Sequence, residues 1–130
     1  MELDIKELNV KKDDRGAVLE IIKRDLINED IQEVLMISSK PGVIRGNHYH
    51  ERKGEWLCIV QGKAKFVYED IKTGERKELI VDGEKPTIIK TPKNVSHAVQ
   101  NIGDGDLLMI EISDKLYDEK NPDTVRKPVM

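Results

Sequence analysis

Two of the chain's three histidines stand one residue apart, in the stretch GVIRGNHYHERKGEW that covers residues 42–56. Successive side chains of a β-strand point to opposite faces, so His48 and His50 share a face, with Cα atoms roughly 6–7 Å apart. Glu55 follows a short polar turn, and His97 is the remaining histidine. Three imidazoles and a carboxylate suit a divalent transition metal, so we expect these four residues to converge on one ion.

A structural role for the histidines is the simpler alternative to metal binding. A single histidine in a strand more often has a structural role than a ligand role, and this alternative applies to His97 taken alone. For His48, His50 and Glu55 the close spacing favours binding of one metal ion by all three residues. We further expect Glu55 to open the next strand and to lie beside the histidine pair in an antiparallel hairpin.

The elements that must hold these residues are predicted to be short strands. β-type runs recur along the chain, separated by turn signals rich in Gly, Pro, Asn and Asp. The runs are AVLEII, EVLMIS, GVIRGNHYH, EWLCIV, AKFVYED, KELIV, TIIK, HAVQN and LLMIEI. No ten residues sustain a 3.6-residue apolar period. The pattern predicts an all-β sandwich or barrel, with at most one helical turn near residues 118–121.

Two smaller predictions concern the loops. FVYEDIKTGERKELIV is typical of a hairpin, and its turn centres on Thr73 and Gly74 with a charged, exposed tip. The tail DEKNPDTVRKPVM has two prolines and few apolar residues, so it should lie over the surface and not form a central strand.

Length and composition limit the possible functions. The 130 residues fit one domain, and 38% apolar residues can form a core. With 22 basic and 25 acidic residues the net charge is −3, and no basic block is present, which argues against nucleic-acid binding. No signal peptide or membrane-spanning run is evident, so we expect a soluble cytoplasmic protein. Cys58, in WLCIV, is expected to be a buried core residue.

The spacing of the ligand candidates resembles a known family. Residues 42–62 match the first motif of the cupins without a gap, as G-x5-H-x-H-x4-E-x6-G. Residues 86–101 resemble the second motif, with Pro86 and Asn94 where that motif has glycines. Asn tolerates a left-handed backbone, so the turn at Asn94 should form. The resemblance implies a cupin double-stranded β-helix, a jelly-roll barrel, over residues 1–130.

RGNHYH, GKAKF, SHAVQNIGDGDL and YDEKNPDT resemble the C-terminal cupin domain of bifunctional capsular polysaccharide reductase/epimerases. This likeness implies an enzyme that binds zinc and epimerises a carbon next to the 4-keto group of a nucleotide-linked 6-deoxy sugar. Iron, manganese and nickel remain alternatives for the metal.

Two more distant resemblances point to the same class of substrate. DDRGAVLE and GVIRGNHY are similar to dTDP-4-dehydrorhamnose 3,5-epimerases, which use no metal. In that family the residue matching His48 is the general base, and a lysine stands where this chain has Glu55. The third relative is the group of sugar-nucleotide 3,4-ketoisomerases.

If all three histidines bind a metal, the proton acceptor must be another group. A tyrosine, a lysine, a carboxylate or a hydroxide held by the ion could serve. Tyr68, Lys90 and Tyr117 are candidates, and simple packing is the alternative for each. Trp56 alternates with Glu55 and should point away from the metal.

Arg45 is a candidate for substrate binding. It lies three residues before His48, hence on the opposite strand face, unless Gly46 permits a bulge that changes the parity. The resemblance to the epimerases implies that Arg45 contacts the substrate, and a surface salt bridge is the alternative.

We therefore expect a metal-dependent epimerase or isomerase that acts on a nucleotide sugar in surface polysaccharide biosynthesis. The alternatives are a non-catalytic cupin that binds a metal or a sugar, and another metal-dependent cupin enzyme such as a dioxygenase. By analogy with small cupins, a homodimer is expected.

Overall fold

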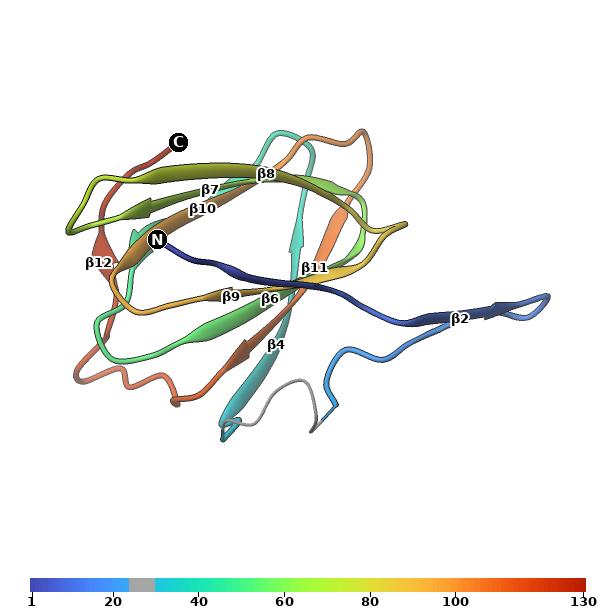
Figure 1. Ribbon diagram of the computed structural model, residues 1–130, viewed down its shortest axis with the longest axis horizontal. Helices are drawn as coiled ribbons and strands as arrows, with labels where there is room; N and C mark the ends of the chain where they lie inside the picture. The colour runs from blue at the N-terminus through green and yellow to red at the C-terminus, as the bar shows by residue number, and fades with distance from the viewer. Residues whose placement is uncertain (24–29) are drawn as a thin grey trace.

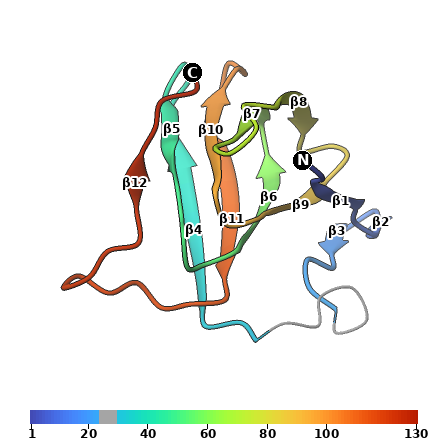
Figure 2. The ribbon, with the colours of Figure 1, turned by 60° about the vertical axis from the view of Figure 1, so that its left-hand side comes forward.

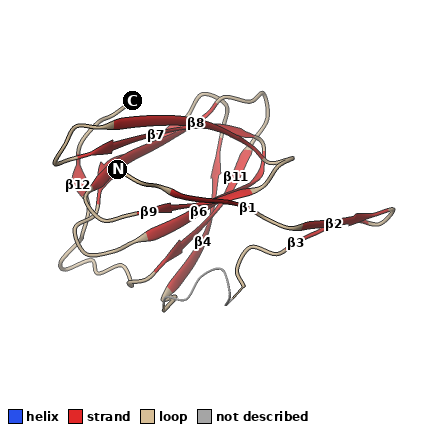
Figure 3. Ribbon diagram, in the orientation of Figure 1, coloured by secondary structure: helices blue, strands red, loops and turns tan. Residues whose placement is uncertain are grey.

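The computed structural model describes residues 1–23 and 30–130, and every regular element in these residues is a β-strand (Figure 3). Ten of the strands form two five-stranded antiparallel sheets. In spatial order the first sheet comprises β1 (Asp4–Glu7), β9 (Thr87–Thr91), β6 (Glu55–Gln61), β11 (Leu107–Ser113) and β4 (Glu33–Ser39). The second comprises β12 (Val125–Arg126), β5 (Ile44–Tyr49), β10 (Val95–Asn101), β7 (Lys63–Asp70) and β8 (Arg76–Asp82). The all-β prediction is confirmed.

The core lies between the two sheets, which wrap into a barrel (Figure 1). Leu57 and Ile59 of β6 point inward and pack in one cluster with Phe66 and Tyr68 of β7. Because side chains alternate along a strand, Glu55 also faces inward from the start of β6. The apolar alternation of the strands thus places one acidic side chain at the end of the barrel interior.

The outer face of the first sheet has a second apolar cluster. Trp56, Cys58 and Ile112 are buried there together with Leu8 of the N-terminal segment. Burial confirms the prediction for Cys58, and Trp56 does point away from the barrel interior. The Nζ atom of Lys90 lies 5.2 Å from the centre of the Trp56 ring, so Lys90 is on the same outer face.

The remaining strands, β2 (Val10–Asp13) and β3 (Gly16–Leu19), form a hairpin that extends away from the barrel (Figure 1). Strands β1 and β2 were not predicted from the sequence, and the predicted strand AVLEII ends at Leu19. Within the described residues no helix is long and apolar enough to cross a bilayer.

Both loop predictions are confirmed. Gly74 takes a positive φ of 74° in the turn between β7 and β8 and donates a backbone hydrogen bond to Asp70. The tail forms only the short strand β12 at the edge of the second sheet, beside β5 (Figure 2). At residues 118–121 the chain makes a single turn, in which the amide of Asn121 donates to the carbonyl of Asp118.

Candidate metal and active site

The structure brings the three histidines together at one end of the barrel interior. His48 of β5 and His97 of β10 are direct partners in the second sheet, and His50 follows immediately after β5. The centres of the rings of His48 and His50 are 4.9 Å apart, and those of His48 and His97 are also 4.9 Å apart. One nitrogen from each ring lies within 4.8 Å of the other two, which is close enough for all three to ligate one ion.

Glu55 joins this cluster from the opposite sheet. Its Oε1 atom lies 3.1 Å from Nε2 of His50, and its Oε2 atom lies 3.4 Å from Nε2 of His97. The prediction of a β5–β6 hairpin is wrong, because the loop between them carries the chain from one sheet to the other. Glu55 therefore contacts His50 and His97 across the barrel interior and not along a sheet.

The electrostatics of the cluster reflect its burial. Burial opposes the charged form of Glu55, but His50 and His97 outweigh it and hold the pKa of the carboxyl well below its ordinary value. Burial, with the charges of His97 and His50, lowers the pKa of His48 to about 4. Burial also opposes charge on His50, yet Glu55 and the carbonyl of Asp123 outweigh it and raise the pKa of that imidazole.

The hydrogen bonds of the imidazoles show that the cluster suits a cation. Nδ1 of His50 lies 2.6 Å from the carbonyl oxygen of Asp123, so Nδ1 must carry the proton. In the neutral ring Nε2 then presents a lone pair to the Glu55 carboxylate, and this buried atom has no hydrogen-bond partner. Nδ1 of His97 similarly faces the carbonyl of Val95 at 3.2 Å. A lone pair directed at a carboxylate is stabilised by a proton or a metal ion between the two atoms, and two such nitrogens with one carboxylate are a donor set that fits a divalent metal.

Asp123 supports the site from the C-terminal tail and was missed in the sequence analysis. Besides the carbonyl that accepts from His50, its carboxylate accepts hydrogen bonds from the backbone amides of Glu51, Arg52 and Lys53 at 2.8–3.0 Å. Burial disfavours its charge, but these bonds outweigh burial and lower the pKa of Asp123. The motif YDEKNPDT contained this residue, but nothing in its local pattern shows that it reaches the loop after β5.

A bulge in β5 decides the position of Arg45. Gly46 and Asn47 have positive φ angles of 96° and 57°, and the register of β5 against β10 shifts at this point. The extra residue changes the parity of the strand, so Arg45 points to the same face as His48. Its guanidinium donates to Oγ of Ser39 and to the carbonyl of Ser38, each at 2.9 Å. Asn94 also has a positive φ, of 60°, as predicted for the turn before β10.

Arg45, His48, His97 and Glu111 are the polar side chains that line a cavity of about 280 Å³ in the barrel. Its other walls are largely apolar, formed by Ile37, Leu57, Val99 and Met109. Glu111 of β11 was not among the predicted site residues. Burial and the charge of Glu55 raise the pKa of Glu111 to about 7.

Lys53 is a further charged residue that the sequence analysis missed. Its ammonium lies 2.8 Å from Oε1 of Glu55 and 4.0 Å from Oε1 of Glu111. Burial alone would lower the pKa of Lys53, but the two carboxylates raise it, so Lys53 is a cation beside Glu55 and Glu111.

A comparison with known protein families identifies the family of the chain. Residues 11–125 match the family described as the polysaccharide biosynthesis C-terminal domain. The chain belongs to this family. Among curated relatives, it is 31% identical to a UDP-2-acetamido-2,6-beta-L-arabino-hexul-4-ose reductase of Pseudomonas aeruginosa, over 91% of this chain and 31% of the relative. It is also 31% identical to the spore coat polysaccharide biosynthesis protein SpsL of Bacillus subtilis, over 95% of this chain and 86% of the relative.

A third relative is a probable low-salt glycan biosynthesis epimerase, Agl13 of Haloferax volcanii. It is 27% identical, over 98% of this chain and 86% of its own length. Among solved structures, the capsular polysaccharide assembling protein CapF of Staphylococcus aureus is 33% identical with a TM-score of 0.74. That match covers 94% of this chain and 34% of CapF. The chain thus spans about a third of the length of CapF and of the Pseudomonas reductase.

The fold of this polysaccharide biosynthesis C-terminal domain is that of the cupins. A 3,4-ketoisomerase from Helicobacter canadensis superposes with a TM-score of 0.81, over 98% of this chain and 92% of that one, at 22% identity. Together with CapF it confirms the predicted jelly-roll barrel and the resemblance to reductase/epimerases and ketoisomerases.

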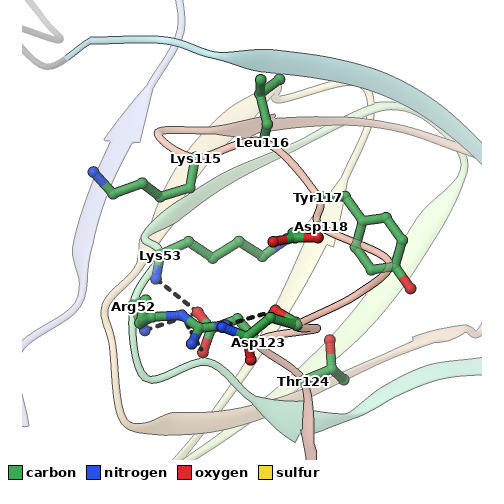
Figure 4. Close-up of a pocket in the computed structure, with 9 residues that line it drawn as sticks. Arg52, Lys53, Lys115, Leu116, Tyr117, Asp118, Asp123 and Thr124 are labelled. Carbon is green, nitrogen blue, oxygen red and sulfur yellow. Dashed lines mark hydrogen bonds and ion pairs between the residues drawn. The ribbon is translucent and has the colours of Figure 1, made fainter.

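The three candidate bases in this domain all lie outside the cavity. Tyr68 is fully buried in the core, with its ring centre 6.4 Å from that of His97, and burial raises its pKa. Lys90 points to the outer face of the first sheet, over Trp56. Tyr117 lies on the loop after β11, beside a separate pocket that it shares with Arg52 (Figure 4). The structure does not bring Lys90 or Tyr117 to the histidines.

Proposed function

We propose that the chain is a metal-dependent epimerase or isomerase that acts next to the 4-keto group of a nucleotide-linked deoxy sugar. The observation that supports this most strongly is the convergence of three imidazoles and Glu55 beside a cavity that also contains Arg45. Two of the relatives, SpsL and Agl13, are named for polysaccharide or glycan biosynthesis, and the third is named as a reductase of a UDP-linked hexul-4-ose.

His48, His50, His97 and Glu55 would hold the ion, for which zinc is the best match to an imidazole-rich site with one carboxylate. Such an ion supplies Lewis-acid stabilisation of the negative charge that forms on a ketone oxygen when a neighbouring proton is removed. The protein's part is to fix the ligands. The carbonyl of Asp123 sets the tautomer of His50, and the bulge at Gly46 keeps His48 and Arg45 on one face.

Arg45 would contact the sugar or the diphosphate of the substrate. Its two hydrogen bonds to Ser38 and Ser39 hold the guanidinium at the cavity wall, so little side-chain freedom is lost when an anion binds. The apolar walls would then face the deoxy carbon of the sugar.

Hydrogen exchange tests this function. The purified protein is incubated in deuterated water with a panel of dTDP- and UDP-linked 4-keto-6-deoxy sugars, and the sugar is analysed by NMR. We expect deuterium at a carbon beside the ketone, with loss of exchange after the metal is removed and recovery when zinc is restored. Absence of exchange across the panel would overturn the proposal. Bound iron with oxygen uptake would point to a dioxygenase instead.

We also propose that the chain forms a homodimer. Strand β4 is an edge of the first sheet, and it presents Val34 and Met36 with more than half of their surface exposed. An unpaired edge with exposed apolar side chains is stabilised when a second copy covers it. Sedimentation equilibrium should give twice the mass of 14.9 kDa; a monomer at micromolar concentration would contradict the proposal.

A further inference from the structure

Glu111 lies in the cavity but has no part in the ligand set described above. It is on β11, directly opposite Leu57 of β6, and alternates with the buried residue Met109 on the inner face of the first sheet. Its side chain is 16% exposed, so it is accessible from the cavity but largely removed from bulk solvent. A carboxylate in such a place needs a reason, because burying a charge in apolar surroundings is unfavourable.

Glu111 has two charged neighbours, the carboxyl of Glu55, which shares a hydrogen bond with it, and the ammonium of Lys53. Lys53 lies 4.0 Å from it, but the same ammonium is only 2.8 Å from Glu55, so Lys53 is bound chiefly to Glu55. The walls next to Glu111 are the apolar side chains Leu57 and Met109. Lys53 thus compensates part of the charge of Glu111 from 4.0 Å away.

The other polar groups of the cavity are less suited to accept a proton. His48 and His97 are candidate metal ligands, and a nitrogen that holds an ion has no lone pair left for a proton. The guanidinium of Arg45 remains protonated in proteins. Tyr68, Lys90 and Tyr117 are not among the residues that line this cavity. Among the lining residues of the described chain, Glu111 is the one carboxylate.

We propose that Glu111 is the general base that removes the proton from the carbon beside the ketone. This inference rests on the proposed function. One carboxylate oxygen of Glu111 takes the proton as the C–H bond breaks, and the electron pair of that bond forms a C=C bond while the ketone oxygen takes the negative charge. A proton from a water molecule on the opposite face of the sugar then returns to the carbon and completes the inversion, and Glu111 releases its proton to solvent.

The test is the Glu111→Gln variant in the deuterium-exchange assay, with zinc content and melting temperature measured on the same samples. We expect exchange to fall by about 10²–10⁴-fold, the usual contribution of a general base, while zinc content and melting temperature stay as in the wild type. Glu78→Gln is the matched control, because Glu78 is a half-exposed carboxylate on β8 of the other sheet.

Two results would overturn the inference. Exchange within about twofold of the wild type would show that another group removes the proton. If the variant loses both its zinc and its exchange activity, Glu111 supports the metal site and is not the base. In both cases exchange by the wild type would leave the proposed function intact, whereas absence of exchange in the wild type would remove the function and the inference together.

Discussion

Nδ1 of His50 donates a hydrogen bond of 2.6 Å to the carbonyl oxygen of Asp123, which joins the C-terminal tail to the histidine cluster. The carboxylate of the same residue binds the three backbone amides of residues 51–53. Asp123 thereby fixes both the tautomer of His50 and the loop that leads to Glu55. A metal ligand is oriented by such outer contacts, and their loss weakens binding.

Replacing Asp123 by alanine should therefore lower zinc affinity by about 10–100-fold, because the three amides of the loop that joins His50 to Glu55 lose their acceptor and that loop is no longer held against the tail. A competition titration with a chromophoric chelator measures the affinity. Asp118→Ala is the control, since the Asp118 carboxylate accepts a hydrogen bond from the exposed amide of Lys120. Equal zinc affinities for the two variants would show that the tail does not support the site.

Gly46→Ala should disturb the site through the backbone. A Cβ atom at Gly46 would lie 2.6 Å from the carbonyl oxygen of His97 and 3.1 Å from Cα of Ala98, so β5 and β10 must separate. Gly42 has a similar positive φ of 83°, but a Cβ there meets nothing within 4 Å. Gly42→Ala should then cost only the backbone strain of about 1–2 kcal/mol.

Urea denaturation of the two glycine variants distinguishes the cost of backbone strain from the cost of the steric clash between a Cβ atom at residue 46 and β10. We expect Gly46→Ala to lose clearly more stability than Gly42→Ala and also to lose zinc affinity, because His97 and Arg45 are displaced. Similar free energies of unfolding for both variants would mean that the bulge is easily adjusted.

The partly buried His48 makes the metal-free protein sensitive to acid. Its folded-state pKa of about 4 lies below the ordinary value of 6.5, so between these pH values the unfolded chain binds more protons than the folded chain. Its contribution to stability is present above pH 6.5 and is lost as the pH falls toward 4. In chelator-treated protein, the wild type should lose on the order of 1–2 kcal/mol relative to His48→Asn over this range. Parallel stability curves for the two proteins would contradict the assigned burial effect.

Much of the site could be predicted because the spacing of its residues is local. His48 and His50 share a face in any strand, and apolar alternation around them predicts an all-β fold. Only the motif spacing indicates that Glu55 and His97 lie near the other two histidines. The predicted hairpin was wrong for Glu55, which contacts the histidines from the other sheet.

The residues that were missed depend on contacts distant in sequence. Asp123 and His50 are 73 positions apart, and no local pattern connects them. The inward direction of Glu111 follows from alternation in β11, but its place beside the cavity depends on how the two sheets close. The sequence predicts the strand that contains Lys90 but not how that strand pairs with its neighbours, so Lys90 stayed a base candidate. Its pairing with Trp56 places it on the outer face.

The most direct test of the metal site is the zinc content of purified protein that has been stripped, reloaded and dialysed, measured by inductively coupled plasma mass spectrometry. We expect one zinc per chain in the wild type and in Glu78→Gln, and a large loss in His48→Ala, His50→Ala and His97→Ala. A wild-type protein that retains no metal, or a His48→Ala variant that retains all of it, would contradict a metal site built on the three histidines.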